Sequence, residues 1–322
     1  MNMEEPIVSV IIPTYNRAHL IQDALESVFA QTFKDYEVIV IDDGSTDNTR
    51  EVLGPSMNQI HYFYQENQGI SGARNRGILL SRGKYMAFLD SDDRWLPEKL
   101  EKQVSYMETH PKVGLLCCYL WRYEIGKENE REKRPQGFPK NFEDLLRGPN
   151  LVPTSTVLIR RKCFEWVGTF DTSLPPIEDW DMWLRIARRF DIQCLDTVLS
   201  EHRRHPHNTT TDLAKVYQGY WRFYTKIFRE YGNFLSDRNA FQKKAISFRY
   251  LLGTTYLKRG EMRKALKHIA GSLRVQWSIG TYFDQGHSPF AKVKYFLKPY
   301  GALLVSFFGT VFSLHLPWGR IR

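Results

Sequence analysis

The feature that most constrains the fold is an alternation of apolar runs and amphipathic helical patterns between Ile7 and Tyr119. The runs with the length and apolar composition of buried strands are residues 7–12, 36–41, 60–64, 85–89 and 113–119. Between them, apolar residues recur at helical spacing, for example in 20–28 and 71–80, and Gly83 is expected to end the second of these helices as its C′ residue. Strands that alternate with helices form a mostly parallel sheet with helices on both faces. The alternation therefore predicts an α/β fold.

Polar clusters follow three of these strands. Pro13-Thr14-Tyr15 follows the first strand, Asp42-Asp43-Gly44 follows the second, and Asp90-Ser91-Asp92 follows the fourth. The ligand crevice of such a sheet lies outside the carboxyl ends of its strands. We therefore expect the three clusters to converge on one site.

The run Asp90-Ser91-Asp92 is the strongest candidate for metal binding. Two carboxylates one residue apart, at the end of a buried strand, repel each other unless a partner compensates their charge. Mg²⁺ or Mn²⁺ would do so and would share its coordination with phosphate oxygens. The alternative is an acidic turn before the helix that starts near Pro97. Neither GxGxxG nor GxxxxGK[ST] occurs, which argues against a dinucleotide dehydrogenase and a P-loop enzyme.

Two side chains that follow the first and second expected strands are candidates for contact with a nucleoside. Tyr15 follows the strand-breaking Pro13 and is placed to stack on a nucleobase, whereas Asp43 is placed to accept a hydrogen bond from a base N–H. The alternatives are core packing for Tyr15 and an Asx-type turn with Gly44 for Asp43.

Two helix starts carry further charged candidates. Residues 66–75 end a strand and open a helix, and Arg74 offers a planar fork to phosphate unless it lies on a solvated face. The helix that starts with Glu178 and Asp179 is anchored by Trp180. Its two acids either complement the helix dipole or supply a general base.

Together these segments resemble the family 2 glycosyltransferases of the GT-A fold. The matching segments are 8–16, 38–47, 67–69 with 73–75, 88–93 and 178–179, in the order of the family across residues 7 to about 205. The resemblance implies a Rossmann-like mixed, mostly parallel sheet with helices on both faces. It also implies an inverting enzyme that uses a nucleotide diphosphate sugar.

The resemblance assigns roles to individual residues. The residues implied to contact the nucleotide-sugar donor are Pro13, Tyr15, Arg17, Asp43, Asn67, Arg74, Asp90, Ser91 and Asp92. The implied catalytic base is Asp179. The implied ligands of a divalent metal, Mn²⁺ or Mg²⁺, are Asp92, Asp90 and His205, although His205 lies in a run of arginine and histidine that also fits a surface cluster.

The implied reaction is one in-line displacement with inversion at the anomeric carbon. The favoured donor is a UDP-sugar, and the acceptor is a saccharide or lipid-linked saccharide in cell-surface polysaccharide synthesis at the cell envelope. The alternatives are a nucleotidyltransferase and an inactive module that binds sugar nucleotides. A nucleotidyltransferase needs a strongly basic loop for a triphosphate, which residues 1–90 do not clearly supply.

Charge and periodicity divide the chain into two parts. Residues 1–210, the expected GT-A domain, carry 26 Lys and Arg against 31 Asp and Glu, whereas residues 211–322 carry 19 against 5. The second part is expected to be helical, with a hairpin that turns at Arg259-Gly260. Such a basic region favours an anionic partner, and a membrane surface is preferred over nucleic acid because no recognition motif accompanies the charge.

The C-terminal run Gly301–Leu316 is apolar but shorter than the ~20 residues of a spanning helix. It is expected either to lie in a membrane interface or to be a buried helix. The cysteines lack metal or disulfide spacing, and no signal peptide precedes the first strand. We therefore expect a cytoplasmic protein that is peripheral on the inner face of the cytoplasmic membrane.

Overall fold

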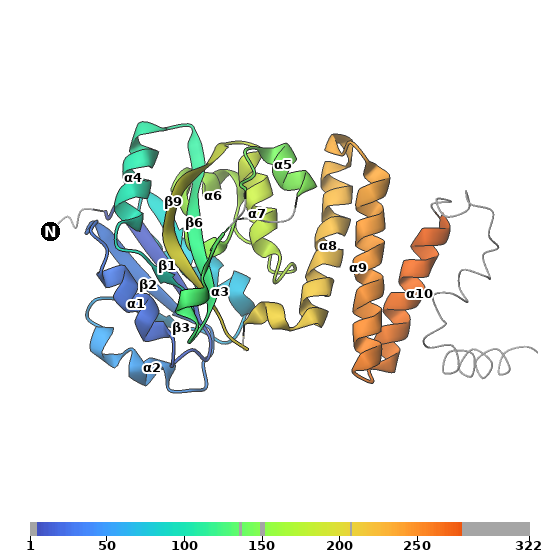
Figure 1. Ribbon diagram of the computed structural model, residues 1–322, viewed down its shortest axis with the longest axis horizontal. Coiled ribbons are helices and arrows are strands. Elements are labelled where there is room, and N and C mark those ends of the chain that lie inside the picture. The colour runs from blue at the N-terminus through green and yellow to red at the C-terminus, as the bar shows by residue number, and fades with distance from the viewer. Residues whose placement is uncertain (1–4, 135–136, 149–151, 207, 279–322) are drawn as a thin grey trace, which may run out of the picture.

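The computed structural model describes residues 5–134, 137–148, 152–206 and 208–278 (Figure 1). Within them lies a nine-stranded sheet. Its strands are β1 (Val8–Thr14), β2 (Tyr36–Asp42), β3 (His61–Tyr64), β4 (Tyr85–Phe88), β5 (Arg94–Trp95), β6 (Val113–Glu124), β7 (Glu132–Arg134), β8 (Leu158–Arg160) and β9 (Asp191–Arg204). Their order is β3-β2-β1-β4-β8-β6-β9-β5, and β7 pairs with β6.

Helices cover both faces of this sheet (Figure 1). They are α1 (Ile21–Phe29), α2 (Thr49–Val52), α3 (Gly69–Leu80), α4 (Lys99–Thr109), α5 (Phe142–Arg147), α6 (Arg161–Val167), α7 (Glu178–Ala187), α8 (Leu213–Tyr231), α9 (Arg238–Lys258) and α10 (Met262–Ser278). Apolar residues of α1 and α4 share one core with β1, and those of α3, α6 and α7 share the other. The predicted α/β fold with helices on both faces is confirmed.

The central strand β1 explains how the two cores form. Val10 and Ile12 lie in the core under α1 and α4, whereas Ile11 lies in the core under α3 and α7. Every residue of β1 is buried, as expected for a strand that is covered on both faces. The sheet is mixed because β8 runs antiparallel to both β4 and β6.

The carboxyl ends of the parallel strands meet at one edge. β1 pairs in parallel with β2 and β4, and the register places Thr14 opposite Asp42. The backbone N–H of Asp43 then donates to the carbonyl of Thr14 at 2.8 Å. The polar clusters that follow β1, β2 and β4 therefore emerge on the same side of the sheet.

Two local features differ from the sequence-based expectations. Gly83 was expected to end a helix in the manner of a C-terminal glycine, but α3 ends at Leu80 and the following residue Ser81 is extended. Gly83 instead packs so close to β1 that a Cβ atom would lie 2.5 Å from the backbone nitrogen of Ser9. Strand β9 was not predicted, because its half-buried, charged residues lack a clear apolar run.

The C-terminal helices α8–α10 stand beside the sheet-containing part, and α8 lies nearest to α7 (Figure 1). The ring of Phe223 in α8 stacks on Trp180 of α7 with centroids 4.4 Å apart. Between α9 and α10, Gly260 has a φ of +75°, so the predicted hairpin turn is confirmed. None of the described helices is both long and apolar enough to cross a bilayer. The run Gly301–Leu316 lies outside the described residues.

Candidate active site

Hydrogen bonds join the loop after β1 to the loop after β2 at the sheet edge. Asn16 adopts a left-handed conformation, with φ of +52°, which lets its side chain turn toward the β2 loop. Its Oδ1 accepts from the backbone N–H of Thr46 at 2.7 Å, and its own N–H donates to Oγ of Ser45 at 2.9 Å. Asn16 was part of a recognised motif, but no site role was predicted for it.

Tyr15 lies in the loop after β1 and Asp43 in the loop after β2, and the two side chains differ in exposure. Asp43 is buried, and its Oδ1 accepts hydrogen bonds from Nε2 of Gln65 at 2.6 Å and from the backbone N–H of Gln68 at 2.9 Å. Tyr15 is 46% exposed, so core packing does not account for its ring. The exposed Asn67 lies beside Gly44, where a Cβ atom would approach its backbone nitrogen to 3.0 Å.

The two acids of the Asp90-Ser91-Asp92 run have different partners. Oδ2 of Asp92 lies 2.9 Å from Nε2 of His205 and accepts from Nδ2 of Asn208 at 3.2 Å. Nε of Arg17 lies 3.8 Å from the same oxygen. Asp90 is instead bound by an arginine of α3, described below. The loop between β4 and β5 therefore presents its acids in two directions.

Asp93, for which no site role was predicted, anchors this loop. Its buried carboxylate accepts from Oγ of Ser155 at 2.5 Å and from the backbone N–H of Arg203 at 3.2 Å. Burial lowers the pKa of the adjacent His202, but the Asp93 carboxylate outweighs this effect and raises it overall. The sequence signal for Asp93 was the third acid of the run, whereas the contribution of Ser155 had no local signal.

Asp179 lies at the first turn of α7 and is half-buried. Burial and the neighbouring Glu178 carboxylate raise the pKa of Asp179 to about 7. The helix is held in place because the indole N–H of Trp180 donates to the Leu145 carbonyl at 2.8 Å. Asp181 is fully buried and forms an ion pair with Arg185, so it is not placed to meet a substrate.

Arg74 connects the two halves of the site. Its NH1 donates to Oε1 of Glu178 at 2.6 Å, and its NH2 donates to Oδ1 of Asp90 at 2.7 Å. The fork that was expected to face a phosphate is therefore occupied by two carboxylates. This pairing also separates Asp90 from Asp92 and His205, which contact each other.

The three predicted metal ligands are thus not gathered as one cluster. Among the residues that the structure describes, no group of three or more His, Cys, Asp or Glu side chains is arranged to hold a metal ion. Asp92 and His205 together offer one carboxylate and one imidazole. These are chemically suitable ligands for Mn²⁺, which would need further oxygen ligands from elsewhere.

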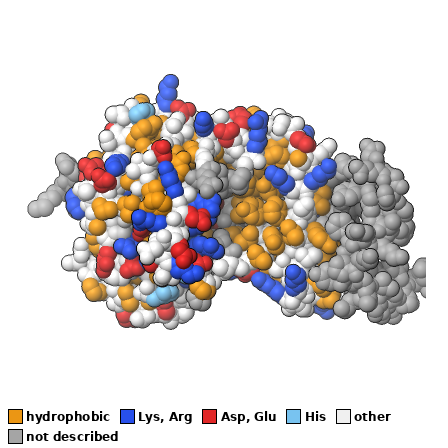
Figure 2. Space-filling model, viewed as in Figure 1, with side chains coloured by type: hydrophobic (Ala, Val, Ile, Leu, Met, Phe, Trp, Pro, Cys, Tyr) orange, Lys and Arg blue, Asp and Glu red, His pale blue; other side chains and the backbone are white. Residues whose placement is uncertain are grey.

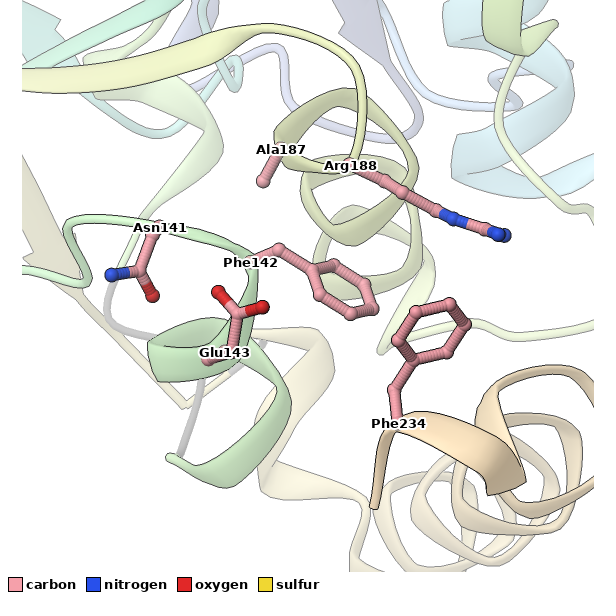
Figure 3. A pocket seen from close by; sticks show the side chains of 6 residues that line it. All are labelled: Asn141, Phe142, Glu143, Ala187, Arg188 and Phe234. Carbon is pink, nitrogen blue, oxygen red and sulfur yellow. The ribbon is translucent and has the colours of Figure 1, made fainter. Parts of the chain in front are cut away.

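A separate hollow of about 420 Å³ lies at the opposite end of α7 from Asp179 (Figure 3). Ala187 and Arg188 line it from the end of α7, and the rings of Phe142 and Phe234 lie side by side at its wall. It contains none of the predicted site residues. We therefore place the candidate active site at the sheet edge and not in this hollow.

Comparisons with known proteins give the family of this chain. A family model described as Glycosyl transferase family 2 matches residues 9–166. An uncharacterized glycosyltransferase of Rickettsia prowazekii is 33% identical over 260 residues, which cover 76% of this chain and 82% of its own length. TuaG of Bacillus subtilis, named as a teichuronic acid biosynthesis glycosyltransferase, is 31% identical over 234 residues, which cover 70% of this chain and 90% of TuaG.

Solved structures share the fold. Residues 1–349 of TarS from S. aureus, in complex with UDP-GlcNAc, align with a TM-score of 0.60 and 19% identity over 83% of this chain and 81% of that chain. The mannosyltransferase PcManGT from Pyrobaculum calidifontis, in complex with GDP-Man and Mn²⁺, aligns with a TM-score of 0.56 and 19% identity over 98% of this chain and 82% of that chain. These likenesses and the mixed sheet identify the GT-A fold.

The family match covers the loops after β1, β2 and β4 but ends before Asp179 and His205. The roles expected for Asp179 and His205 therefore have no support from the family match and depend on their positions in the structure. The family model and the two relatives, of which this chain covers 82% and 90%, agree on the class of enzyme. This chain belongs to family 2 of the glycosyltransferases.

Proposed function

We propose that this glycosyltransferase transfers a sugar from a UDP-sugar to a saccharide hydroxyl, with inversion at the anomeric carbon. One observation carries the proposal: Asp179, an acid with a pKa raised to about 7, is linked through Glu178 and Arg74 to Asp90 of the β4–β5 loop. A general base works best when its pKa lies near the working pH. This link supports a base at Asp179 close to the loop that we propose binds the donor.

The donor would lie across the loops after β1, β2 and β4. Tyr15 is exposed and free of core packing, so its ring can stack on the base, and Asp43 can accept a base N–H. Pro13 and Asn67 border the same loops. Structural neighbours are described with UDP-GlcNAc and with GDP-Man, which supports a nucleoside diphosphate sugar as donor.

A divalent metal fits one part of this donor site. Asp92 and His205 would supply two ligands, and Mn²⁺ or Mg²⁺ commonly completes its coordination with phosphate oxygens and water. The neighbouring PcManGT is described with Mn²⁺, which supports this choice. A metal bound there would offset the negative charge of the departing diphosphate. Asp90, which is bound by Arg74, is not assigned as a ligand.

In the proposed transfer step, Asp179 is the base. Its carboxylate removes the proton from an acceptor hydroxyl while that oxygen forms a bond to the anomeric carbon of the donor sugar. The bond between this carbon and the diphosphate oxygen breaks on the opposite face, and UDP leaves with the electron pair. Entry and departure on opposite faces invert the configuration. Positioning of the two substrates is expected to contribute much of the rate.

The acceptor would approach Asp179 from the side of α8. Gly219 of α8 packs against residues 175–177, where a Cβ atom would lie 2.9 Å from Ile177, and Tyr220 lies at 6.4 Å from the Trp180 ring. Hydrophobic side chains gather over α8 and α9 beside the sheet-containing part (Figure 2). Half-buried rings with polar tips suit the mixed apolar and hydroxyl surface of a saccharide.

We further propose a role in cell-surface polysaccharide synthesis at the inner face of the cytoplasmic membrane. TuaG, of which this chain covers 90%, is named for teichuronic acid biosynthesis. Residues 211–278 carry 14 Lys and Arg against 4 Asp and Glu, which favours peripheral contact with anionic lipid or with an anionic lipid-linked acceptor. The domains 1–210 and 211–322 would thus divide catalysis from membrane and acceptor contact.

The test uses radiolabelled UDP-sugars with and without candidate saccharide acceptors. The expected result is UDP release that depends on acceptor, a product of inverted configuration by NMR, and a kcat that falls about 10²–10⁴-fold in Asp179→Asn with little change in donor KM. Pyrophosphate release from a nucleoside triphosphate would indicate a nucleotidyltransferase. Donor binding without turnover across the acceptor panel would indicate an inactive binding module.

A further inference from the structure

Helix α3 is fastened to the segment that leads into α7. The side chain of Asn75 donates from Nδ2 to the carbonyl of Phe170 at 2.9 Å and accepts from the N–H of Phe170 at 2.8 Å. The Phe170 ring in turn lies beneath the guanidinium of Arg74, at 5.5 Å from its centroid. One end of the segment 170–178 is therefore held by Asn75, and the ring of Phe170 supports the neighbouring arginine.

Arg74 holds the other end of the same segment. Its two terminal nitrogens reach Glu178 at 2.6 Å and Asp90 at 2.7 Å, and the side chains of Arg74 and Glu178 are only 4% and 5% exposed. Charge-assisted hydrogen bonds of this length are strong, and removal of one partner leaves a buried charge without compensation. We call the contacts of Arg74 with Glu178 and with Asp90 the bridge. It connects the β4–β5 loop to the start of α7.

The bridge also contains polar atoms whose bonding capacity is not used. Nε of Arg74 and Oε2 of Glu178 are buried and have no hydrogen-bond partner among the described residues. Packing alone does not favour such atoms, because each has lost its contact with water. Their presence next to Asp179 is consistent with a bridge that is kept for the reaction.

We propose that Arg74 is a positioning residue of the transfer reaction, which ties Glu178 and the adjacent base Asp179 to Asp90 and so sets the base relative to the donor. This inference rests on the proposed function, in which Asp179 removes the acceptor proton. Arg74 touches neither the acceptor nor the anomeric carbon in this role. It acts through Glu178 and through the fixed spacing of two loops.

The charges around Asp179 predict how variants of the bridge should behave. Glu178 of α7 and Asp90 of the β4–β5 loop raise the pKa of Asp179, whereas Arg74 of α3 lowers it. On α8, Tyr220 faces the same carboxylate, and burial, followed by the charge of Asp179, raises the pKa of its phenol. Loss of Glu178 should therefore lower the pKa of the base, and loss of Arg74 should raise it.

The experiment is the pH dependence of kcat/KM for acceptor-dependent transfer in four variants and the full-length wild type. The acid limb of the profile is the range over which kcat/KM falls as the pH is lowered. Glu178→Gln should move this limb to lower pH and Arg74→Gln should move it to higher pH, each by about one unit or more. Arg74→Gln should also lower kcat by about 10²-fold at high pH with little change in donor KM, because the base is misplaced. Arg74→Lys keeps the charge but not the fork, so its acid limb should return toward wild type while kcat stays low.

The matched control is Arg82→Gln. Arg82 forms a similar two-nitrogen contact with Glu37, at 3.0 and 2.8 Å, at the opposite end of α3 from the site. Its pH profile should match wild type, and thermal unfolding reports whether each variant is folded. If Arg74→Gln does not fold, Glu178→Gln and Arg74→Lys still test the proposal.

The proposal is overturned if the acid limbs of the two Gln variants move together or do not move, or if Arg82→Gln causes the same loss of kcat. Failure of the proposed function has a different signature. In that case Asp179→Asn would keep its kcat, and the bridge variants could not act through Asp179.

Discussion

At the scale of single residues, acids of similar chemistry have distinct environments along one crevice. Asp43 is buried among hydrogen-bond donors, Asp92 contacts an imidazole, and Asp179 has burial and a neighbouring carboxylate that disfavour its charged form. These environments suit an acceptor of hydrogen bonds, the proposed metal ligand and the proposed base, respectively. Each assignment therefore leads to its own test.

Asp92→Asn should abolish the enhancement of donor binding by Mn²⁺. The amide keeps the size of the side chain and can still contact Asn208, but it is a far weaker metal ligand than a carboxylate. Titration calorimetry with UDP-sugar, with and without Mn²⁺, measures the effect, and thermal unfolding without metal should be nearly unchanged. Equal Mn²⁺ enhancement in the variant and wild type would remove Asp92 from the metal site.

The transfer rate should depend on pH in the direction set by Asp179. A base must be ionised to accept a proton, and the pKa of Asp179 is raised to about 7. We therefore expect kcat/KM to fall about tenfold per pH unit below 7 and to level off above it. Measurements between pH 5 and 9 with a fixed donor would check this. A profile that is flat down to pH 5 would contradict the assignment.

The sequence predicted which residues lie at the candidate site better than it predicted the contacts between them. Tyr15, Asp43 and Asp92 could be expected at one edge because they follow parallel strands. The pairing of Arg74 with Glu178 could not be predicted, because Glu178 lies 104 residues further along the chain and the choice between phosphate and carboxylate depends on tertiary packing. Ser155 and Asn208 were missed for the same reason.

At the scale of elements, α3 connects the site to the sheet, because it carries Arg74 and packs against β1. Its glycines allow close packing: a Cβ atom on Gly77 would lie 2.3 Å from Cγ2 of Ile11 in β1. Strands β1, β2 and β4 were predictable because they are continuous apolar runs. Strand β9 was not, because its pairing with β6 includes register shifts and its side chains alternate irregularly in burial.

Gly77→Ala should destabilise the protein by about 1–2 kcal/mol. Overpacking a filled core costs about 1–3 kcal/mol, and alanine recovers up to about 1 kcal/mol of helix propensity. Urea unfolding measures the change. The control is Gly54→Ala, where a Cβ atom would meet nothing within 4 Å.

The origin of this loss can be isolated by a double-mutant cycle. Ile11→Ala removes the Cγ2 atom that the new methyl group would meet. The double variant Ile11→Ala/Gly77→Ala should therefore lose less stability than the sum of the single variants. Strictly additive losses would show that the contact between α3 and β1 is not the cause.

At the scale of the whole molecule, α8 packs against α7, the helix that carries Asp179. The rings of Tyr220 and Phe248 stack at 4.6 Å, and Tyr217 lies 6.2 Å from the same Phe248 ring, so α8 and α9 present an aromatic surface near α7. Tyr220→Ala should raise the acceptor KM about tenfold and leave donor KM unchanged, because the ring lies on the side from which we propose that the acceptor approaches. Tyr256→Ala, whose ring contacts His268 of α10, is the control. A change in donor KM alone would contradict this arrangement.

The uneven charge of the chain predicts how the whole molecule meets a membrane. Residues 211–278 have ten more basic than acidic side chains, whereas residues 1–210 have five more acidic than basic ones. Each Lys or Arg near an anionic leaflet contributes about 1 kcal/mol, so several exposed cations on α9 and α10 should give weak, reversible attachment. We expect the full chain to cosediment with vesicles that contain anionic lipid and to be released by high salt, because salt screens surface charge.

The variant Lys243→Gln/Lys244→Gln/Arg263→Gln removes three exposed cations of α9 and α10 and should weaken vesicle binding about 10²-fold or more. The matched control, Lys102→Gln/Lys112→Gln/Lys162→Gln, removes the same charge from exposed positions of the sheet-containing part. If attachment depends on where the charge lies, the control should bind as wild type does. Equal loss in both variants would mean that only net charge matters, and binding that resists both substitution and salt would assign attachment to apolar contact instead.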